Sequence, residues 1–121
     1  MRFPIATLRN ENLAFLKAFS TRLRRGPAIE AVRAGLAVLE AGVKRRCPVG
    51  ATHELENSIH IVGPKADAQG VHGAVVVSSD HALAVEYGTH KEAAQPFVRP
   101  TLDIDGPRAL AVMNEMLRRS P

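Results

Sequence analysis

The sequence predicts a single α+β domain over residues 1–121: a small antiparallel sheet of three to four strands, with two N-terminal helices and one C-terminal helix packed on one face. Three observations indicate this class. Apolar residues recur at helical spacing in residues 12–25 and 27–44, and again beyond residue 101. Three segments between residues 55 and 87 have the alternation or the β-branched content of strands. A chain of 121 residues has the length of one domain, and no internal repeat divides it.

The two predicted N-terminal helices follow a short arm. Residues 1–11 show no periodic pattern and are expected to form a flexible N-terminal arm, or to become ordered only against a partner. The first helix runs from Asn12, its expected N-cap, to about Arg25, and Gly26 is expected to end it. Its apolar face consists of Leu13, Leu16, Phe19 and Leu23. The second helix runs from Pro27 to about Lys44. Its stripe at steps of three and four residues consists of Ile29, Val32, Leu36, Leu39 and Val43.

Three segments predict neighbouring antiparallel strands, because their connections are too short for helical crossovers. These segments are Leu55–Val62, the stretch from Val71 to Ser78, and His81–Tyr87. The connection from Gly63 to Gly70 is polar and small, so it is expected to be an exposed and mobile loop.

A proline-flanked stretch, Gln95–Pro100, leads into the last helix. Pro96 and Pro100 each disfavour helical geometry in the residue before them, which predicts that Phe97 and Val98 are extended and that Phe97 lies in the core. Thr101 or Asp103 is expected to cap the final helix. Its predicted buried face consists of Leu110, Met113 and Leu117.

Composition excludes several classes of protein. Cys47 is the only cysteine, so neither an internal disulfide nor a zinc site of paired thiolates can form. Arg45 and Arg46 beside it could lower its pKa, although a small structural residue at a helix end is the simpler interpretation. No stretch approaches the ~18 apolar residues of a membrane span. The N-terminus lacks the pattern of a signal peptide, so we expect a soluble protein made in the cytoplasm, without a membrane partner.

The charge is uneven along the chain. Residues 1–50 hold ten Lys and Arg against three Glu, a net +7, whereas residues 51–121 hold six against nine acidic residues, a net −3. Such asymmetry is typical of nucleic-acid contact, or of a basic surface that meets an acidic neighbour in an assembly. No aromatic residue interleaves with the basic runs at residues 22–25 and 44–46, so the sequence does not support single-strand stacking.

Candidate catalytic and metal-binding residues are scattered. The five histidines (His53, His60, His72, His81 and His90) include no pair at the i, i+4 spacing of a helical metal site. Asp80 and Glu86 would share the polar face of the third strand with His60, a rudimentary hydrolytic cluster. No nucleophile elbow, phosphate loop or metal-binding carboxylate pair accompanies them. Glu86 has simpler interpretations, as a partner for Arg99 or as a cap for backbone amides near Gly88. The sequence therefore predicts no enzyme, no metal site and no cofactor.

Three short elements between Pro48 and Pro100 resemble a known family. They are a proline before a small turn and a Leu-x-Asn-Ser-Ile element, then a Glu-aromatic-Gly-Thr turn, then a Gln-Pro-Phe-x-Arg-Pro run. In this order they resemble the tail-completion or neck proteins of long-tailed bacteriophages, the gp-ten-like minor tail or head–tail joining proteins. The residues that carry the resemblance are Pro48, Leu55, Asn57, Ser58, Ile59, Glu86, Tyr87, Gly88, Thr89, Gln95, Pro96, Phe97, Arg99 and Pro100. The turn at residues 50–54 departs from the Asp-Thr-Gly turn of the family.

The resemblance implies a structural virion protein without catalytic activity. Such a protein would assemble as a homo-oligomeric ring around the DNA channel at the head–tail junction and join tail to head. Its implied partners are other neck, head-closure or tail proteins, with DNA passing through the lumen without sequence-specific binding. Its implied location is the virion, after synthesis in the host bacterial cytoplasm. The residues leave two alternatives open: a small basic nucleic-acid-binding protein, and a small hydrolase.

Overall fold

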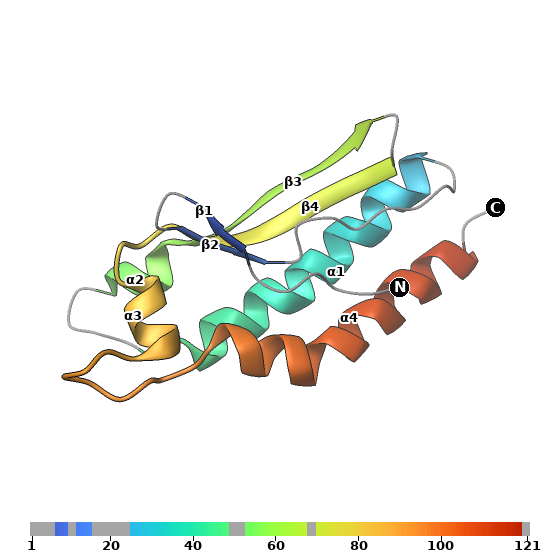
Figure 1. The fold of residues 1–121 in the computed structure, drawn as a ribbon. Helices are drawn as coiled ribbons and strands as arrows, with labels where there is room; N and C mark the ends of the chain where they lie inside the picture. The colour runs from blue at the N-terminus through green and yellow to red at the C-terminus, as the bar shows by residue number, and fades with distance from the viewer. Residues whose placement is uncertain (1–6, 10–11, 16–24, 49–52, 68–69, 120–121) are drawn as a thin grey trace.

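The computed structural model describes residues 7–9, 12–15, 25–48, 53–67 and 70–119. Its strands are β1 (Thr7–Arg9), β2 (Asn12–Phe15), β3 (Ile59–Asp67) and β4 (Gly70–Val77), and its helices are α1 (Arg25–Arg46), α2 (Glu54–Asn57), α3 (Ala82–Tyr87) and α4 (Val98–Arg119). The strands form one antiparallel sheet in the order β1-β2-β4-β3. Figure 1 shows α1 lying along the β3–β4 hairpin and α4 alongside α1, with α2 and α3 at one end of the molecule. The predicted α+β class and the antiparallel sheet are confirmed.

β4 is an inner strand and carries much of the buried face of the sheet. Along Gly70–Val77 its residues alternate between half-buried and buried, the period of two expected for a strand with one face on a core. Val71, Val75 and Val77 point into the core. β3 pairs with β4 from Ile59 opposite Val77 to Asp67 opposite Gly70, with a register shift between Val62 and Lys65.

α1 packs its apolar side against this hairpin. Four residues of the predicted stripe are fully buried: Val32, Leu36, Leu39 and Val43. The fifth, Ile29, is half-buried against the core. Pro27 lies in the first turn as predicted, where its missing N–H costs no hydrogen bond. Gly26 also lies inside α1, so the prediction that it ends a helix is wrong.

α1 and α4 run antiparallel and approach each other closely. A Cβ atom on Gly35 would lie 2.6 Å from Met113 side-chain atoms, and one on Gly42 would collide with Thr101 and Asp105. Gly35 thus faces Met113, and the later Gly42 faces the earlier Thr101 and Asp105, which is the order expected of antiparallel helices. Met113 is buried as predicted, whereas Leu110 and Leu117 are half-buried against the core. The rest of the buried face of α4 consists of Val98, Thr101, Asp105, Gly106 and Ala109.

The predicted helix from Asn12 to Arg25 is wrong in its first part. Asn12–Phe15 is strand β2, which pairs with both β1 and β4. Over so few residues the apolar spacing fits a helix or a strand, and pairing with β4 decides the outcome. The predicted flexible arm is also wrong at Thr7–Arg9, which forms β1. The rest of that arm and residues 16–24 lie outside the described residues.

The predicted mobile loop from Gly63 to Gly70 belongs largely to the hairpin. β3 continues through Gly63 and Pro64, and Lys65, Ala66 and Asp67 pair with β4. The break expected at Gly63-Pro64 is a register shift within the strand, the usual signature of a β-bulge. At its other end β3 starts at Ile59, because Glu54–Asn57 forms the one-turn helix α2 instead of the start of a strand.

The predicted third strand, His81–Tyr87, is wrong, because Ala82–Tyr87 forms helix α3. Ala82 and Glu86 are its buried residues, four apart as on one face of a helix. Ala, Leu and Glu are strong helix formers, and they dominate this segment. The short alternation of Val85, Glu86 and Tyr87 indicates a strand only when it is taken alone.

The start of the last helix also differs from the prediction. Phe97 is fully buried as predicted, but α4 begins at Val98, so Val98 is helical rather than extended. Neither Thr101 nor Asp103 caps the helix. Pro100 lies in the first turn, where a proline removes no helical hydrogen bond. Within the described residues, no helix is long and apolar enough to cross a membrane.

Candidate functional site

The first turn of α4 is capped by a carboxylate that comes from α3. Glu86 Oε1 accepts hydrogen bonds from the backbone amides of Phe97 and Val98, both at 2.9 Å, and its Oε2 accepts one from Arg99 at 3.0 Å. Glu86 is only 5% exposed. A helix leaves its first amides without partners, and its dipole favours an anion at that end. We call this arrangement, Glu86 with the amides of residues 97–99, the carboxylate clamp.

Gly88 lets the chain leave α3 in the direction that the clamp requires. Its φ of 79° lies in a region that side-chain-bearing residues rarely adopt. A Cβ atom at Gly88 would also lie 2.7 Å from the backbone nitrogen of Ala94. The returning chain is held by a hydrogen bond of 2.8 Å from the Gln95 amide to the Val85 carbonyl. The loop between Gly88 and Gln95 is therefore closed at its base.

Thr89 organises the tip of that loop. Its Oγ1 accepts hydrogen bonds from the amides of Lys91 and Glu92, at 3.2 and 3.1 Å. Its own amide donates to the Glu92 carbonyl at 2.9 Å. Residues 89–96 are all exposed, and Figure 1 shows this loop projecting from one end of the molecule. The Glu-Tyr-Gly-Thr and Gln-Pro-Phe-Val-Arg-Pro elements thus form one unit: a clamp with a braced loop.

Two further side chains of this unit, Tyr87 and Arg99, point to solvent. Tyr87 is 62% exposed, and Arg99 is also exposed. The predicted pairing of the Glu86 and Arg99 side chains is wrong: in the described residues no ion pair joins them, and Glu86 contacts Arg99 through its backbone amide instead. The other interpretation, that Glu86 caps backbone amides, is confirmed in part. Glu86 does cap amides, but these belong to residues 97–99 rather than to residues near Gly88.

The Leu-x-Asn-Ser-Ile element joins α2 to the sheet. Ser58 Oγ donates to the Leu55 carbonyl at 2.7 Å and ends α2. The Ser58 carbonyl accepts a hydrogen bond from the Ser78 amide at 3.2 Å, just after β4, and Ile59 enters the core. Asn57 is exposed, and Pro48 is half-buried after α1. Of the turn at residues 50–54 that departs from the family, residues 50–52 lie outside the described residues, and His53 has a left-handed φ of 55°.

A second polar cluster links α1 to α4. Arg46 Nη1 donates to Asp105 Oδ2 at 2.6 Å and to Thr101 Oγ1 at 3.2 Å, and Arg45 Nη2 donates to the same Asp105 oxygen at 3.0 Å. Thr101 Oγ1 in turn donates to the Phe97 carbonyl at 2.7 Å. The cluster therefore connects the end of α1 to the first turn of α4. Gly42 leaves room for this cluster, because a side chain at position 42 would collide with Asp105 and Thr101.

Asp105 stays ionised in this cluster. The hydrogen bond from Arg46 and the charges of Arg46, Arg45 and Arg108 hold the pKa of its carboxyl below the ordinary value, although burial alone would raise it. The Asp105 side chain is 7% exposed, the Arg46 side chain 21% and the Arg45 side chain 55%. Arg46 is thus a packed structural partner, whereas Arg45 also reaches solvent.

The idea that neighbouring arginines activate Cys47 is wrong. Cys47 is buried, and burial together with the charge of Glu56 raises the pKa of its thiol to about 11. A thiol with so high a pKa carries almost no thiolate at neutral pH, so it is a poor nucleophile.

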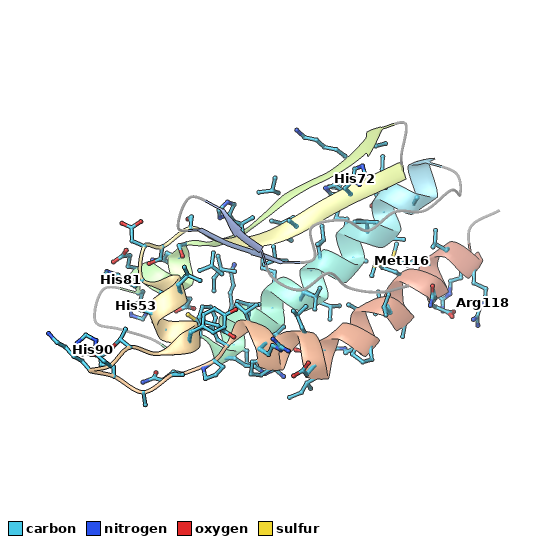
Figure 2. The ribbon with its side chains drawn as sticks, in the orientation of Figure 1. His53, His72, His81, His90, Met116 and Arg118 are labelled. Atoms are coloured by element: carbon cyan, nitrogen blue, oxygen red, sulfur yellow. The ribbon has the colours of Figure 1, made fainter. Side chains whose placement is uncertain are left out.

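The structure does not bring the proposed hydrolytic residues together. The carboxylate of Glu86 is occupied by three amides, whereas Asp80 and His60 are exposed. His60 Nδ1 lies 3.0 Å from the Ser58 carbonyl. Figure 2 shows His53 and His81 near α2 and α3, His90 on the projecting loop and His72 on β4. In the described part of the chain, no group of His, Cys, Asp or Glu is placed to hold a metal ion.

The sequence interpretation missed the Arg46–Asp105–Thr101 cluster. A signal was present: Thr101, Asp105, Ala109 and Met113 recur every four residues, so two polar residues share the buried face of α4. A buried polar pair requires a partner, and the basic end of α1 was the available one. Comparisons of the chain with protein-family models, with curated proteins and with solved structures find no match.

Proposed function

We propose that the protein is a structural component of the head–tail junction of a long-tailed bacteriophage, a neck or tail-completion protein. It assembles as a homo-oligomeric ring around the DNA channel and joins the tail to the head. Its partners are neck, head-closure or tail proteins, and its location is the virion. This role requires no catalytic residue and no cofactor.

The carboxylate clamp is the observation that carries the proposal. Two of the three elements that resemble the neck family are separate in sequence, yet Glu86 of one holds the amides of Phe97, Val98 and Arg99 of the other. Their residue types follow from this geometry: a carboxylate to accept the amides, a glycine at φ 79° and a threonine that braces the loop. The resemblance therefore extends over one physical unit rather than over unrelated short matches.

A closed ring requires two different surfaces on each subunit, because every subunit meets its two neighbours through unlike faces. The outer edge of β3 is one candidate, since an edge strand presents unpaired backbone groups. Val62, on this strand, is 47% exposed. The outer side of the clamp is the other candidate, because Tyr87 is 62% exposed and Arg99 is also exposed.

Arg99 offers a test that separates assembly from folding. The fold uses its backbone amide, which an alanine retains, whereas its guanidinium lies in solvent. Arg99→Ala should therefore change the melting temperature little and weaken ring formation. Arg118→Ala, at the far end of α4 (Figure 2), removes the same charge and is the control.

Light scattering and negative-stain electron microscopy would measure assembly of the purified protein, alone and with the neck and tail proteins of the same phage. Rings whose formation is weaker in Arg99→Ala than in Arg118→Ala are the expected result. A protein that stays monomeric under both conditions would overturn the proposal. Equal assembly by both variants would show that the clamp surface is not part of the interface between subunits.

A further inference from the structure

An excess of positive charge lies where α1 ends beside α4. Arg45 and Arg46 share one carboxylate oxygen of Asp105, and Arg108 is near enough to lower the pKa of the same group. Two guanidinium groups thus donate to one carboxylate, and Arg108 adds a third positive charge nearby, so these three arginines and Asp105 together carry a net charge of +2. We call Arg45, Arg46 and Arg108 the arginine cluster.

The buried carboxylate fixes this cluster in place. Asp105 holds Arg45 by one nitrogen, and a guanidinium has five N–H donors in a planar fork. The side chain of Arg45 is 55% exposed, so its remaining donors face solvent. Arg108 is exposed one turn further along α4. An arginine that is already oriented loses less rotamer freedom when it binds an anion.

Among the described residues, the positions one turn before Arg45 and one turn before Arg108 leave these two arginines accessible. One turn before Arg45 on the same side of α1 is Ala41, and one turn before Arg108 on α4 is Ile104. Both are exposed, and neither carries an acidic group that would neutralise the arginines. Lys44, next to Arg45, is paired with Glu40 at 3.8 Å and therefore adds little net charge.

We propose that the arginine cluster binds the phosphate backbone of double-stranded DNA, without reading its sequence. Guanidinium groups match phosphate oxygens in geometry and charge, and such contacts release counterions from DNA. The cluster also gives a position to part of the positive charge that the first half of the sequence carries. This inference deepens the proposed function, because it identifies the surface that faces the DNA channel.

The test measures binding of a mixed-sequence duplex of about twenty base pairs by fluorescence anisotropy at 50 and 200 mM salt. Each phosphate contact contributes ~0.9 to the slope of log affinity against log salt. Arg45→Ala/Arg108→Ala should therefore lower the slope by about two, which shrinks the affinity ratio between the two salt concentrations about ten-fold. Arg118→Ala/Arg119→Ala removes the same charge next to Glu115 and should leave the slope within about half a unit of the native value.

Arg45→Lys is a second variant, which retains the charge and should retain most of the slope. Arg46 is left unchanged because it packs α1 against α4.

Equal losses in both double variants would show a diffuse charge effect and would overturn the inference. Inorganic phosphate is added as a competitor at low millimolar concentration. If it abolishes DNA binding, the cluster is a small-anion site and the inference is overturned. If the cluster variant forms fewer rings but binds DNA normally, the cluster belongs to a protein interface and the ring proposal survives. If the native protein forms normal rings that do not bind DNA, the DNA-binding inference is refuted and the ring proposal is unaffected.

Discussion

Single side chains with several partners hold the structure together at the end where α3 meets α4. Glu86 is the clearest case, because one carboxylate serves three backbone amides and also fixes where the fully buried Phe97 enters the core. Its role could be predicted only in part. The sequence indicates that a carboxylate beside Gly88 caps amides, but the identity of the amides depends on α3 being a helix.

Glu86→Gln should destabilise the protein by about 1–3 kcal/mol, since the side-chain amide can still accept at one atom but presents N–H groups to the Arg99 amide. Glu86→Ala should cost more, because all three amides lose their acceptor. Glu92→Gln, an exposed carboxylate in the same loop, is the matched control and should stay within about 0.5 kcal/mol. Denaturant melts of the three variants measure these free energies of unfolding. A Glu86→Gln protein as stable as the control would contradict the clamp.

Asp105 should make stability depend on pH in the acid range. Its hydrogen bond with Arg46 lowers the pKa of its carboxyl in the folded state, so the unfolded chain binds the proton first as pH falls. The stabilisation is fully present above the unfolded value of about 3.9, and it disappears as pH falls through the lower folded value. Native protein should thus be more stable than Asp105→Asn at pH 6, and the difference should shrink toward pH 2.5. A difference between the two melting curves that stays constant with pH would contradict this assignment.

Whole elements were predictable where one pattern persisted over many residues. The stripe of α1 recurs over four turns, and β4 is a run of valines with one face to the core, so both were recognisable. α3 has only six residues, too few to distinguish a period of 2 from a period of 3.6. β3 crosses Gly63 and Pro64, residues that normally end a strand, because pairing with β4 resumes beyond the bulge.

The contact between α1 and α4 predicts an effect opposite to helix propensity. Alanine is favoured over glycine in a helix by about 1 kcal/mol, so propensity alone predicts that Gly42→Ala is stabilising. The new Cβ atom would collide with Asp105 and Thr101, which should separate the helices and make the change destabilising by about 1–3 kcal/mol. Ala41→Gly, on the exposed neighbour, isolates the propensity effect. Thermal melts that show a stabilised Gly42→Ala protein would mean that the helices pack less closely here.

At the scale of the whole molecule, stability should be distributed along the chain in a way that hydrogen exchange can map. β4 pairs with β2 on one side and β3 on the other, and Val75 to Val77 lie where both ladders overlap. The amides of these three residues should exchange most slowly, at the rate set by global unfolding. The loop of residues 89–94 is exposed, and its tip is braced through the amides of Thr89, Lys91 and Glu92. The amides of His90, Ala93 and Ala94 should therefore exchange much faster than the amides of the sheet. Lys65 to Asp67 provide the sharpest comparison. As part of the hairpin, their paired amides should be slower than that loop by at least ten-fold, whereas the composition of Gly63–Gly70 alone predicts equal rates. Equal exchange in the two segments would indicate that the far end of the hairpin opens readily. In the proposed ring, additional protection at the outer edge of β3 would identify that edge as an interface, and protection confined to residues 87–99 would assign the contact to the clamp.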